Sequence, residues 1–157
     1  MNKKTNLLLG LIVALLAIVG IFVLFSTAFG GDGDNSSVRG SVFYVMLGDS
    51  ERGYASVGGL ISAFALLIVG TVSAVIGGCF KGKLASLVFL FTAVVLAISG
   101  VLFAMGPSLY MSANAGTINP DMLDTPITLG TGLICAMVFS FAPAVLALYG
   151  AYSTFKE

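Results

Sequence analysis

Residues 57–80, VGGLISAFALLIVGTVSAVIGGCF, and residues 84–105, LASLVFLFTAVVLAISGVLFAM, decide the fold of this chain. Neither stretch contains Asp, Glu, Lys or Arg, and only the tripeptide KGK at positions 81–83 separates them. A helix that crosses a bilayer needs about 20 apolar residues, because each residue covers about 1.5 Å of a hydrocarbon core about 30 Å thick. We therefore expect two membrane-spanning helices that the short linker joins as an antiparallel hairpin.

Two further apolar stretches of the same kind, residues 7–29 and 128–152, flank this hairpin. Backbone N–H and C=O groups in hydrocarbon must be paired within the protein, so only helices or a closed β-barrel are possible. Barrel strands alternate apolar and polar residues over about ten positions, whereas these stretches are continuous and twice as long. The sequence predicts an all-α, integral membrane four-helix bundle, in one domain over residues 1–157, with external loops 30–56 and 106–127 and an internal loop 81–83.

The composition excludes most soluble functions. Hydrophobic residues make up 58% of the 157 and charged residues only 9%, against roughly 25% charged in soluble domains. Seven basic and seven acidic residues, with no His, leave no basic surplus for nucleic acid and no His-based metal or acid–base site. The spans also lack the ionisable residues that mark ion pathways, and no phosphate loop or nucleophile motif is present. We expect no enzymatic activity, no cofactor, no metal and no nucleic-acid partner.

The charges are distributed unequally between the two sides. Four spans place the termini and the loop 81–83 on one side, which carries five lysines, Lys3, Lys4, Lys81, Lys83 and Lys156. The other side carries Arg39 and Arg52 together with six of the seven acidic residues, Asp32, Asp34, Asp49, Glu51, Asp121 and Asp124. The positive-inside rule therefore predicts a multi-pass protein of the cell membrane with both termini in the cytoplasm.

The first span has an alternative interpretation as a cleaved secretory signal. Lys3 and Lys4 precede the apolar run, and Ser26-Thr27-Ala28 has the small residues of a cleavage site. The run is longer than the 7 to 15 residues of a typical signal core, so we expect the first span to be retained.

Small residues recur at spacings of three and four in the spans. In a membrane, such stripes allow two helix backbones to approach closely. The stripes are Gly70, Ala74 and Gly78 in the second span, Ala93, Ala97, Gly100 and Ala104 in the third, and Gly132, Ala136, Ser140 and Ala144 in the fourth. We interpret them as packing sites within one bundle. The alternative is that one stripe, with the fourth span as the leading candidate, faces another subunit.

Pro143 lies deep in the fourth span. Proline cannot donate to the carbonyl of Phe139, so we expect a kink there. Ser140 lies one turn away and is expected to satisfy a freed carbonyl. Proline is common in membrane helices for packing reasons, and the alternative is a gate or binding site at this midpoint.

The two cysteines are interpreted as small buried residues. Cys79 is placed at the inner end of the second span and Cys135 near the outer end of the fourth, roughly 20 Å apart in depth. That separation is far beyond the reach of a disulfide, and lipidation of Cys79 is a remote alternative.

The external loops contain two short apolar segments. Residues 41–47, SVFYVML, are rich in β-branched and aromatic residues and predict a short strand, or else a segment lying on the membrane interface. Residues 108–111 are expected to pair with this strand as a cap over the bundle, and Asn119-Pro120-Asp121 to form a turn. Asp32 and Asp34 resemble the start of a calcium loop, but Ser37 and Phe43 replace its glycine and glutamate, so we expect a solvated acidic loop. Asn35-Ser36-Ser37 is a formal glycosylation sequon whose use we do not expect.

In layout, the chain resembles the tetraspan proteins of the claudin type, with short inner ends, a long first outer loop and a shorter second one. It lacks the Trp and the paired cysteines of their first outer loop, so no residue role is transferred. The leading hypothesis is a structural or accessory membrane protein that acts through helix–helix packing, as a homo-oligomer or as a subunit with another membrane protein. The alternative is a pore or carrier for a neutral or apolar solute, formed between subunits.

Overall fold

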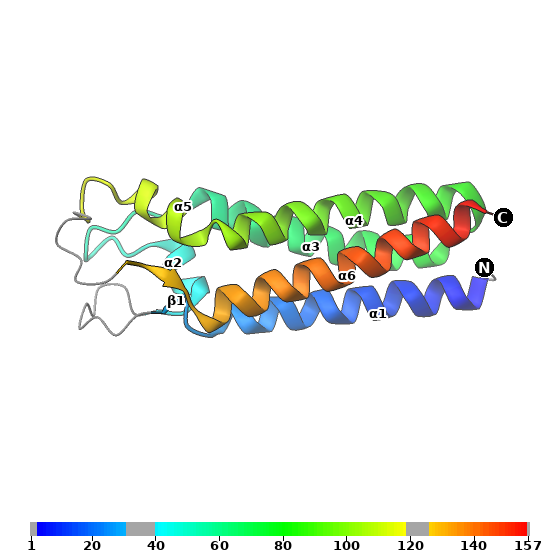
Figure 1. Cartoon of the computed structure of the whole chain (residues 1–157), viewed down its shortest axis with the longest axis horizontal. Coiled ribbons are helices and arrows are strands. Elements are labelled where there is room, and N and C mark those ends of the chain that lie inside the picture. The colour runs from blue at the N-terminus through cyan, green and yellow to red at the C-terminus, as the bar shows by residue number, and fades with distance from the viewer. Residues whose placement is uncertain (1–2, 31–39, 119–125, 157) are drawn as a thin grey trace.

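Four long helices dominate the computed structural model, which describes residues 3–30, 40–118 and 126–156 (Figure 1). They are α1 (Lys3–Phe22), α3 (Gly58–Cys79), α4 (Gly82–Ala104) and α6 (Thr131–Phe155). A 3₁₀ turn, η1 (Val23–Phe25), extends α1. All four helical segments are long and apolar enough to cross a membrane. The predicted all-α four-helix bundle is therefore confirmed.

Successive long helices run antiparallel, and both chain termini lie at the same end of the bundle (Figure 1). The helix α1 packs beside α3 and α6, and α4 packs beside the same two helices. Only Phe80 and Lys81 separate α3 from α4, and so short a connection requires the two helices to lie side by side.

The helices differ from the predicted spans chiefly at the end opposite the chain termini. The first helical segment stops at Phe25 rather than continuing to residue 29, because Ser26 adopts an extended conformation with ψ of 170°. The fourth helix begins at Thr131 rather than at residue 128 and extends to Phe155. The residues lost from the two spans contribute their backbone groups to a cap at this end.

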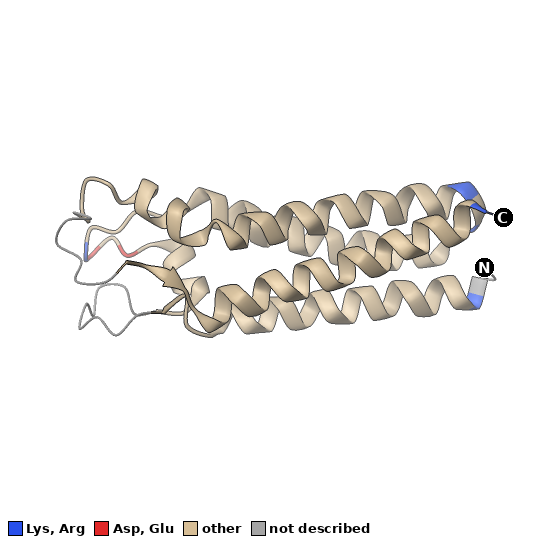
Figure 2. Ribbon diagram, in the orientation of Figure 1, with Lys and Arg blue, Asp and Glu red and all other residues tan. Residues whose placement is uncertain are grey.

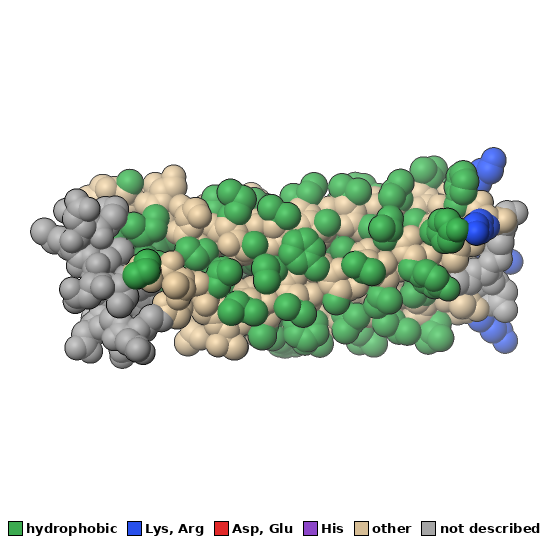
Figure 3. Space-filling model, in the orientation of Figure 1, with side chains coloured by type: hydrophobic (Ala, Val, Ile, Leu, Met, Phe, Trp, Pro, Cys, Tyr) green, Lys and Arg blue, Asp and Glu red, His purple; other side chains and the backbone are tan. Residues whose placement is uncertain are grey.

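The core of the bundle is filled by large apolar side chains. Leu67, Leu96, Phe89 and Phe103 are completely buried between the helices. Apolar side chains also cover the face of the bundle seen in Figure 3. A surface of this kind is suited to contact with lipid or with another apolar helix rather than with water.

The predicted strand at residues 41–47 is wrong, because α2 (Val42–Leu47) is a helix. Ser41 caps it, since its hydroxyl oxygen accepts a hydrogen bond of 3.2 Å from the backbone N–H of Tyr44. Val42, Val45 and Met46 are buried, which is the spacing of one face of a helix. The N-cap and this buried face outweigh the β propensity of the side chains.

The expected pairing of residues 108–111 with that segment is also wrong, because these residues belong to the helix α5 (Gly106–Ala113). Pro107 occupies the first turn of α5, where its missing N–H costs nothing. The same proline cannot continue the hydrogen bonding of α4, which accounts for the break between α4 and α5 at Met105.

A two-stranded antiparallel sheet is nevertheless present at the end opposite the chain termini. It pairs β1 (Phe29–Gly30) with β2 (Thr128–Leu129), in the register Phe29 to Leu129 and Gly30 to Thr128. Its strands follow the first span and precede the fourth, so the pairing joins the ends of α1 and α6. The cap therefore consists of α2, α5 and this sheet.

Candidate functional site

The small-residue stripes lie inside the chain's own bundle. Ala97 and Ala104 are half-buried, and the other nine residues, Gly70, Ala74, Gly78, Ala93, Gly100, Gly132, Ala136, Ser140 and Ala144, are buried. Their neighbours differ from residue to residue. A Cβ atom added to Gly70 would meet Leu96 of α4, one added to Gly78 would meet α1, and one added to Gly100 would meet Phe141 of α6. The buried residues of these stripes therefore pack within the chain's own bundle.

A close backbone approach joins α1 to α3. A Cβ atom at Gly10 would lie 2.5 Å from the carbonyl oxygen of Ala74 and 3.1 Å from the Cα atom of Gly78. A Cβ atom at Gly78 would in turn lie 3.0 Å from the carbonyl oxygen of Asn6. Glycine at both positions is what allows the two backbones to touch.

Buried hydroxyl groups connect the long helices, and sequence reasoning missed this role. The hydroxyl of Ser99 in α4 donates to the carbonyl oxygen of Ala63 in α3 at 2.8 Å, and that of Ser86 donates to Ala151 in α6 at 2.7 Å. The hydroxyls of Ser73 and Thr92 lie 2.8 Å apart across α3 and α4. The sequence signal for such a hydrogen bond is a Ser or Thr near the small residues of a stripe. A hydroxyl at that position is buried in the bundle and needs a hydrogen-bond partner.

Asn6 is a second polar residue that the sequence did not single out. Its side chain is completely buried, and its Nδ2 atom donates to the carbonyl oxygen of Phe80 at 3.3 Å, from the first turns of α1 to the end of α3. Its Oδ1 atom is buried without a hydrogen-bond partner among the residues that the structure describes. The predicted first span began at residue 7, which left Asn6 outside it.

Ser99→Ala is expected to destabilise the bundle by about 0.6 kcal/mol, because an interhelical hydrogen bond in a membrane protein is worth about that much. The control is Ser62→Ala, since the hydroxyl of Ser62 is exposed and bonds only to Gly58 of its own helix. Unfolding by SDS, followed by circular dichroism, measures both variants. Equal stabilities of the two variants would mean that the contact between Ser99 and Ala63 contributes nothing.

The expected role of Ser140 beside Pro143 is wrong. The hydroxyl of Ser140 donates to the carbonyl oxygen of Ala136 at 2.8 Å and not to the carbonyl of Phe139. Pro143 is buried within a continuous α6. The carbonyl of Phe139 faces α1, where a Cβ atom added to Gly20 would lie 3.5 Å from its oxygen. Pro143 is therefore buried inside the bundle, one turn after the contact of Phe139 with α1.

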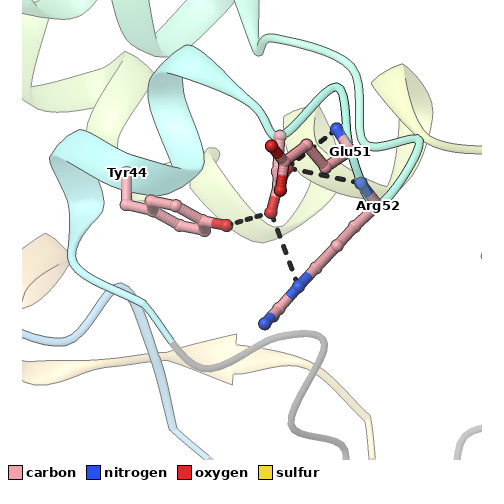
Figure 4. A network of polar contacts seen from close by, with 4 residues as sticks. Tyr44, Glu51 and Arg52 are labelled. Atoms are coloured by element: carbon pink, nitrogen blue, oxygen red, sulfur yellow. Dashed lines mark hydrogen bonds and ion pairs between the residues drawn. The ribbon is translucent and has the colours of Figure 1, made fainter.

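In the cap, Asp49 organises a turn that follows α2 (Figure 4). Its Oδ1 atom accepts hydrogen bonds from the backbone N–H groups of Glu51 and Arg52, at 3.0 and 3.3 Å. Its Oδ2 atom accepts from the hydroxyl of Tyr44 and lies 3.5 Å from Nε of Arg52. The hydrogen bond from Tyr44 is the main reason that the pKa of Asp49 lies below its usual value, and the same bond raises the pKa of Tyr44.

Tyr44→Phe is expected to raise the pKa of Asp49 toward its usual 3.8, because the hydroxyl stabilises the carboxylate. The lowered pKa of Asp49 means that this bond stabilises the fold above about pH 4 and that the stabilisation is lost as the pH falls through the folded-state pKa. A pH titration of the Asp49 carboxyl carbon by NMR measures the shift. Arg52→Gln is the control and should raise the pKa less, since the charge of Arg52 is a smaller cause. An unchanged pKa in Tyr44→Phe would contradict the assignment.

Aromatic rings pack against one another within the cap. The ring of Tyr110 in α5 lies 4.9 Å from that of Phe29 and 6.5 Å from that of Tyr54. Burial raises the pKa of Tyr110 to about 12. Asn114 joins the segment after α5 to the segment before α3, because its Oδ1 atom accepts a hydrogen bond from the backbone N–H of Ala55 at 2.8 Å. Its Nδ2 atom donates to the backbone carbonyl oxygen of Tyr110. These contacts are those of a packed cap.

The ionisable residues in the structure lie at the two ends of the bundle (Figure 2). Lysines occupy the end with the chain termini, and Asp49, Glu51 and Arg52 occupy the cap. Cys79 is exposed at the end of α3, which differs from its interpretation as a buried residue, and Cys135 is half-buried. No three His, Cys, Asp or Glu residues come together within residues 3–30, 40–118 and 126–156.

Three predictions for the external loops fall on residues outside these ranges. They are the acidic loop with Asp32 and Asp34, the sequon at Asn35, and the turn at Asn119-Pro120-Asp121. Comparison of the chain with protein-family models, with curated proteins and with solved structures finds no match.

Proposed function

We propose that this chain is a non-enzymatic structural or accessory protein of the cell membrane. In this proposal it spans the bilayer four times, with both termini in the cytoplasm, and associates through its outer apolar surface with further copies of itself or with another membrane protein. The observation that carries the proposal is the division of the molecule into an interior of small residues and mostly bonded polar groups and a predominantly apolar exterior along the long helices.

The interior supports this proposal because most of its described polar groups are bonded within the chain. The buried hydroxyls of Ser86 and Ser99 bond to neighbouring helices, and large side chains such as Phe89 fill the space between them. A reactive side chain needs both access and an activating neighbour. The described interior offers a rigid support and not a reaction centre.

The exterior supports association because large apolar side chains project from every long helix. Leu15, Val72, Leu87 and Val145 are each at least half exposed, one on each helix. Contact with a second protein would use the packing of these side chains. Lipid covers the part of this surface that no protein occupies.

Photo-crosslinking in native membranes tests the association. A photoreactive amino acid is placed singly at Leu15, Val72, Leu87 and Val145, with the buried Leu67 as the control position. Mass measurement of the products is expected to give multiples of 16.1 kDa for a homo-oligomer, or one other defined mass for a complex. Products with lipid alone at all four outward positions would contradict the proposal.

Cysteine labelling tests the orientation. Cys79 lies exposed at the lysine-rich end, so a membrane-impermeant maleimide added to intact cells should not label it in a Cys135→Ser background. Glu51→Cys in a chain without its native cysteines should be labelled, because residue 51 is exposed in the cap. The reverse pattern would place the termini outside the cell.

The competing proposal is a pore or carrier for a neutral solute, formed between subunits and gated at Pro143. The buried position of Pro143, one turn after the contact of Phe139 with α1, favours the structural role over this one. Liposomes containing the protein should retain small neutral solutes as well as empty liposomes do. Leakage that Pro143→Leu abolishes would favour the pore.

A further inference from the structure

We propose that the bundle binds a phospholipid with a negatively charged headgroup at the corner where α4 begins and α6 ends. We call Lys81, Lys83 and Lys156 the basic corner, and all three side chains are exposed. The inference rests on the proposed membrane-spanning function and adds a specific lipid class to it.

A buried hydrogen bond holds α4 and α6 together beside the basic corner. The hydroxyl of Ser86 donates to the carbonyl oxygen of Ala151 at 2.7 Å, and a Cβ atom added to Gly150 would lie 3.3 Å from the ring of Phe89. Lys83 precedes Ser86 by less than one turn, and Lys156 follows Ala151 by little more than one turn. Because α4 and α6 run antiparallel, the lysines leave both helices at the same end.

The charge of this end is unbalanced in the part of the chain that the structure describes. Two carboxylates belong to the described residues, Asp49 and Glu51, and both lie in the cap at the opposite end of the bundle (Figure 2). Figure 3 shows lysine side chains projecting beyond the apolar band of the bundle. A phosphodiester group at the membrane surface offers oxygen atoms that can accept hydrogen bonds from several ammonium groups at once.

The surroundings of the lysines favour a lipid over a soluble phosphate compound. Leu84 and Leu87 of α4 follow Lys81 and Lys83 in the chain, and the two leucine side chains are 52% and 63% exposed. Tyr152 of α6 is 59% exposed, and the Nζ atom of Lys156 lies 4.5 Å from the centre of its ring. Tyr side chains occupy the headgroup level of membranes. The corner thus presents charge for a headgroup beside apolar surface for acyl chains.

Native mass spectrometry of the full chain tests the proposal. The protein is equilibrated with micelles that contain equal amounts of phosphatidylglycerol and phosphatidylcholine, and the retained lipids are counted. Each lysine near an anionic headgroup contributes about fivefold to binding, so wild type should retain phosphatidylglycerol at least tenfold more than phosphatidylcholine. Lys81→Gln/Lys83→Gln/Lys156→Gln should bring the preference close to one.

The matched control is Arg39→Gln/Arg52→Gln, which removes cations from the external side and should leave the preference unchanged. Inorganic phosphate and soluble glycerophosphoglycerol at the same concentration are expected to displace little of the bound lipid. Complete displacement by either would mean a site for soluble phosphate compounds and would overturn the lipid assignment.

Equal retention of the two lipids by wild type, or an unchanged preference in the triple variant, would also overturn the inference. Resistance of each variant to alkaline carbonate extraction is measured in parallel. A variant that stays in the membrane but shows no lipid preference contradicts only the headgroup site. Extraction of the wild type by carbonate would contradict the membrane-spanning function itself.

Discussion

Gly10→Ala is expected to lower the free energy of unfolding by about 3 kcal/mol, at the upper end of the cost of overpacking. The new Cβ atom would lie 2.5 Å from the carbonyl oxygen of Ala74. That oxygen is part of the backbone of α3, so α1 and α3 must separate to accommodate the methyl group. SDS unfolding in mixed micelles, followed by circular dichroism, measures the loss.

Two further glycine substitutions make this a graded test. A Cβ atom at Gly70 would lie 2.4 Å from Cδ2 of Leu96, and because a leucine side chain can move, Gly70→Ala should cost less than Gly10→Ala. Gly58 begins the same helix with nothing within 4 Å of an added Cβ atom, so Gly58→Ala should cost nothing. If Gly10→Ala and Gly58→Ala unfold at the same SDS fraction, the close approach of α1 and α3 does not limit stability.

Gly132→Ala is expected to loosen the cap from the bundle and to lower the free energy of unfolding by about 3 kcal/mol. An added Cβ atom would lie 2.7 Å from the carbonyl oxygen of Ser26 and 2.8 Å from that of Thr27. These two carbonyls accept hydrogen bonds from the N–H groups of Val42 and of Gly132 itself, at 3.1 and 2.8 Å. The substitution therefore strains both the start of α6 and the attachment of α2.

Hydrogen–deuterium exchange at the amide of Val42 measures this effect. Exchange should become about 100-fold faster in Gly132→Ala, because a loss of nearly 3 kcal/mol corresponds to that factor. Gly116→Ala is the control within the cap, since nothing lies within 4 Å of an added Cβ atom there. Unchanged exchange at Val42 would show that the cap is held independently of the start of α6.

The secondary structure of the cap could not be predicted from the sequence. Residues 41–47 carry β-branched and aromatic side chains, but they form a helix because Ser41 caps it and Val42, Val45 and Met46 find a buried surface. Neither that surface nor the pairing of Phe29 with Leu129 can be inferred from neighbours in the chain. Six residues have too few local hydrogen bonds to determine their own conformation.

The candidate site was only partly accessible to sequence reasoning. The spacing of Gly70, Ala74 and Gly78 indicated close packing, but it did not reveal that Gly70 faces α4 while Gly78 faces α1. Asn6 was missed because its burial depends on the end of α3, more than 70 residues later in the chain.

The sequence by itself determined four helices and the separation of charge between their two ends. Each span is longer than the hydrocarbon thickness requires and free of formal charge, so local composition is sufficient for that conclusion. The tertiary structure decided which helix each small residue faces, which hydroxyls bond across the bundle, and how the cap is built. Those features depend on contacts between distant segments, where a shift of a single residue in register replaces a glycine by a bulky side chain.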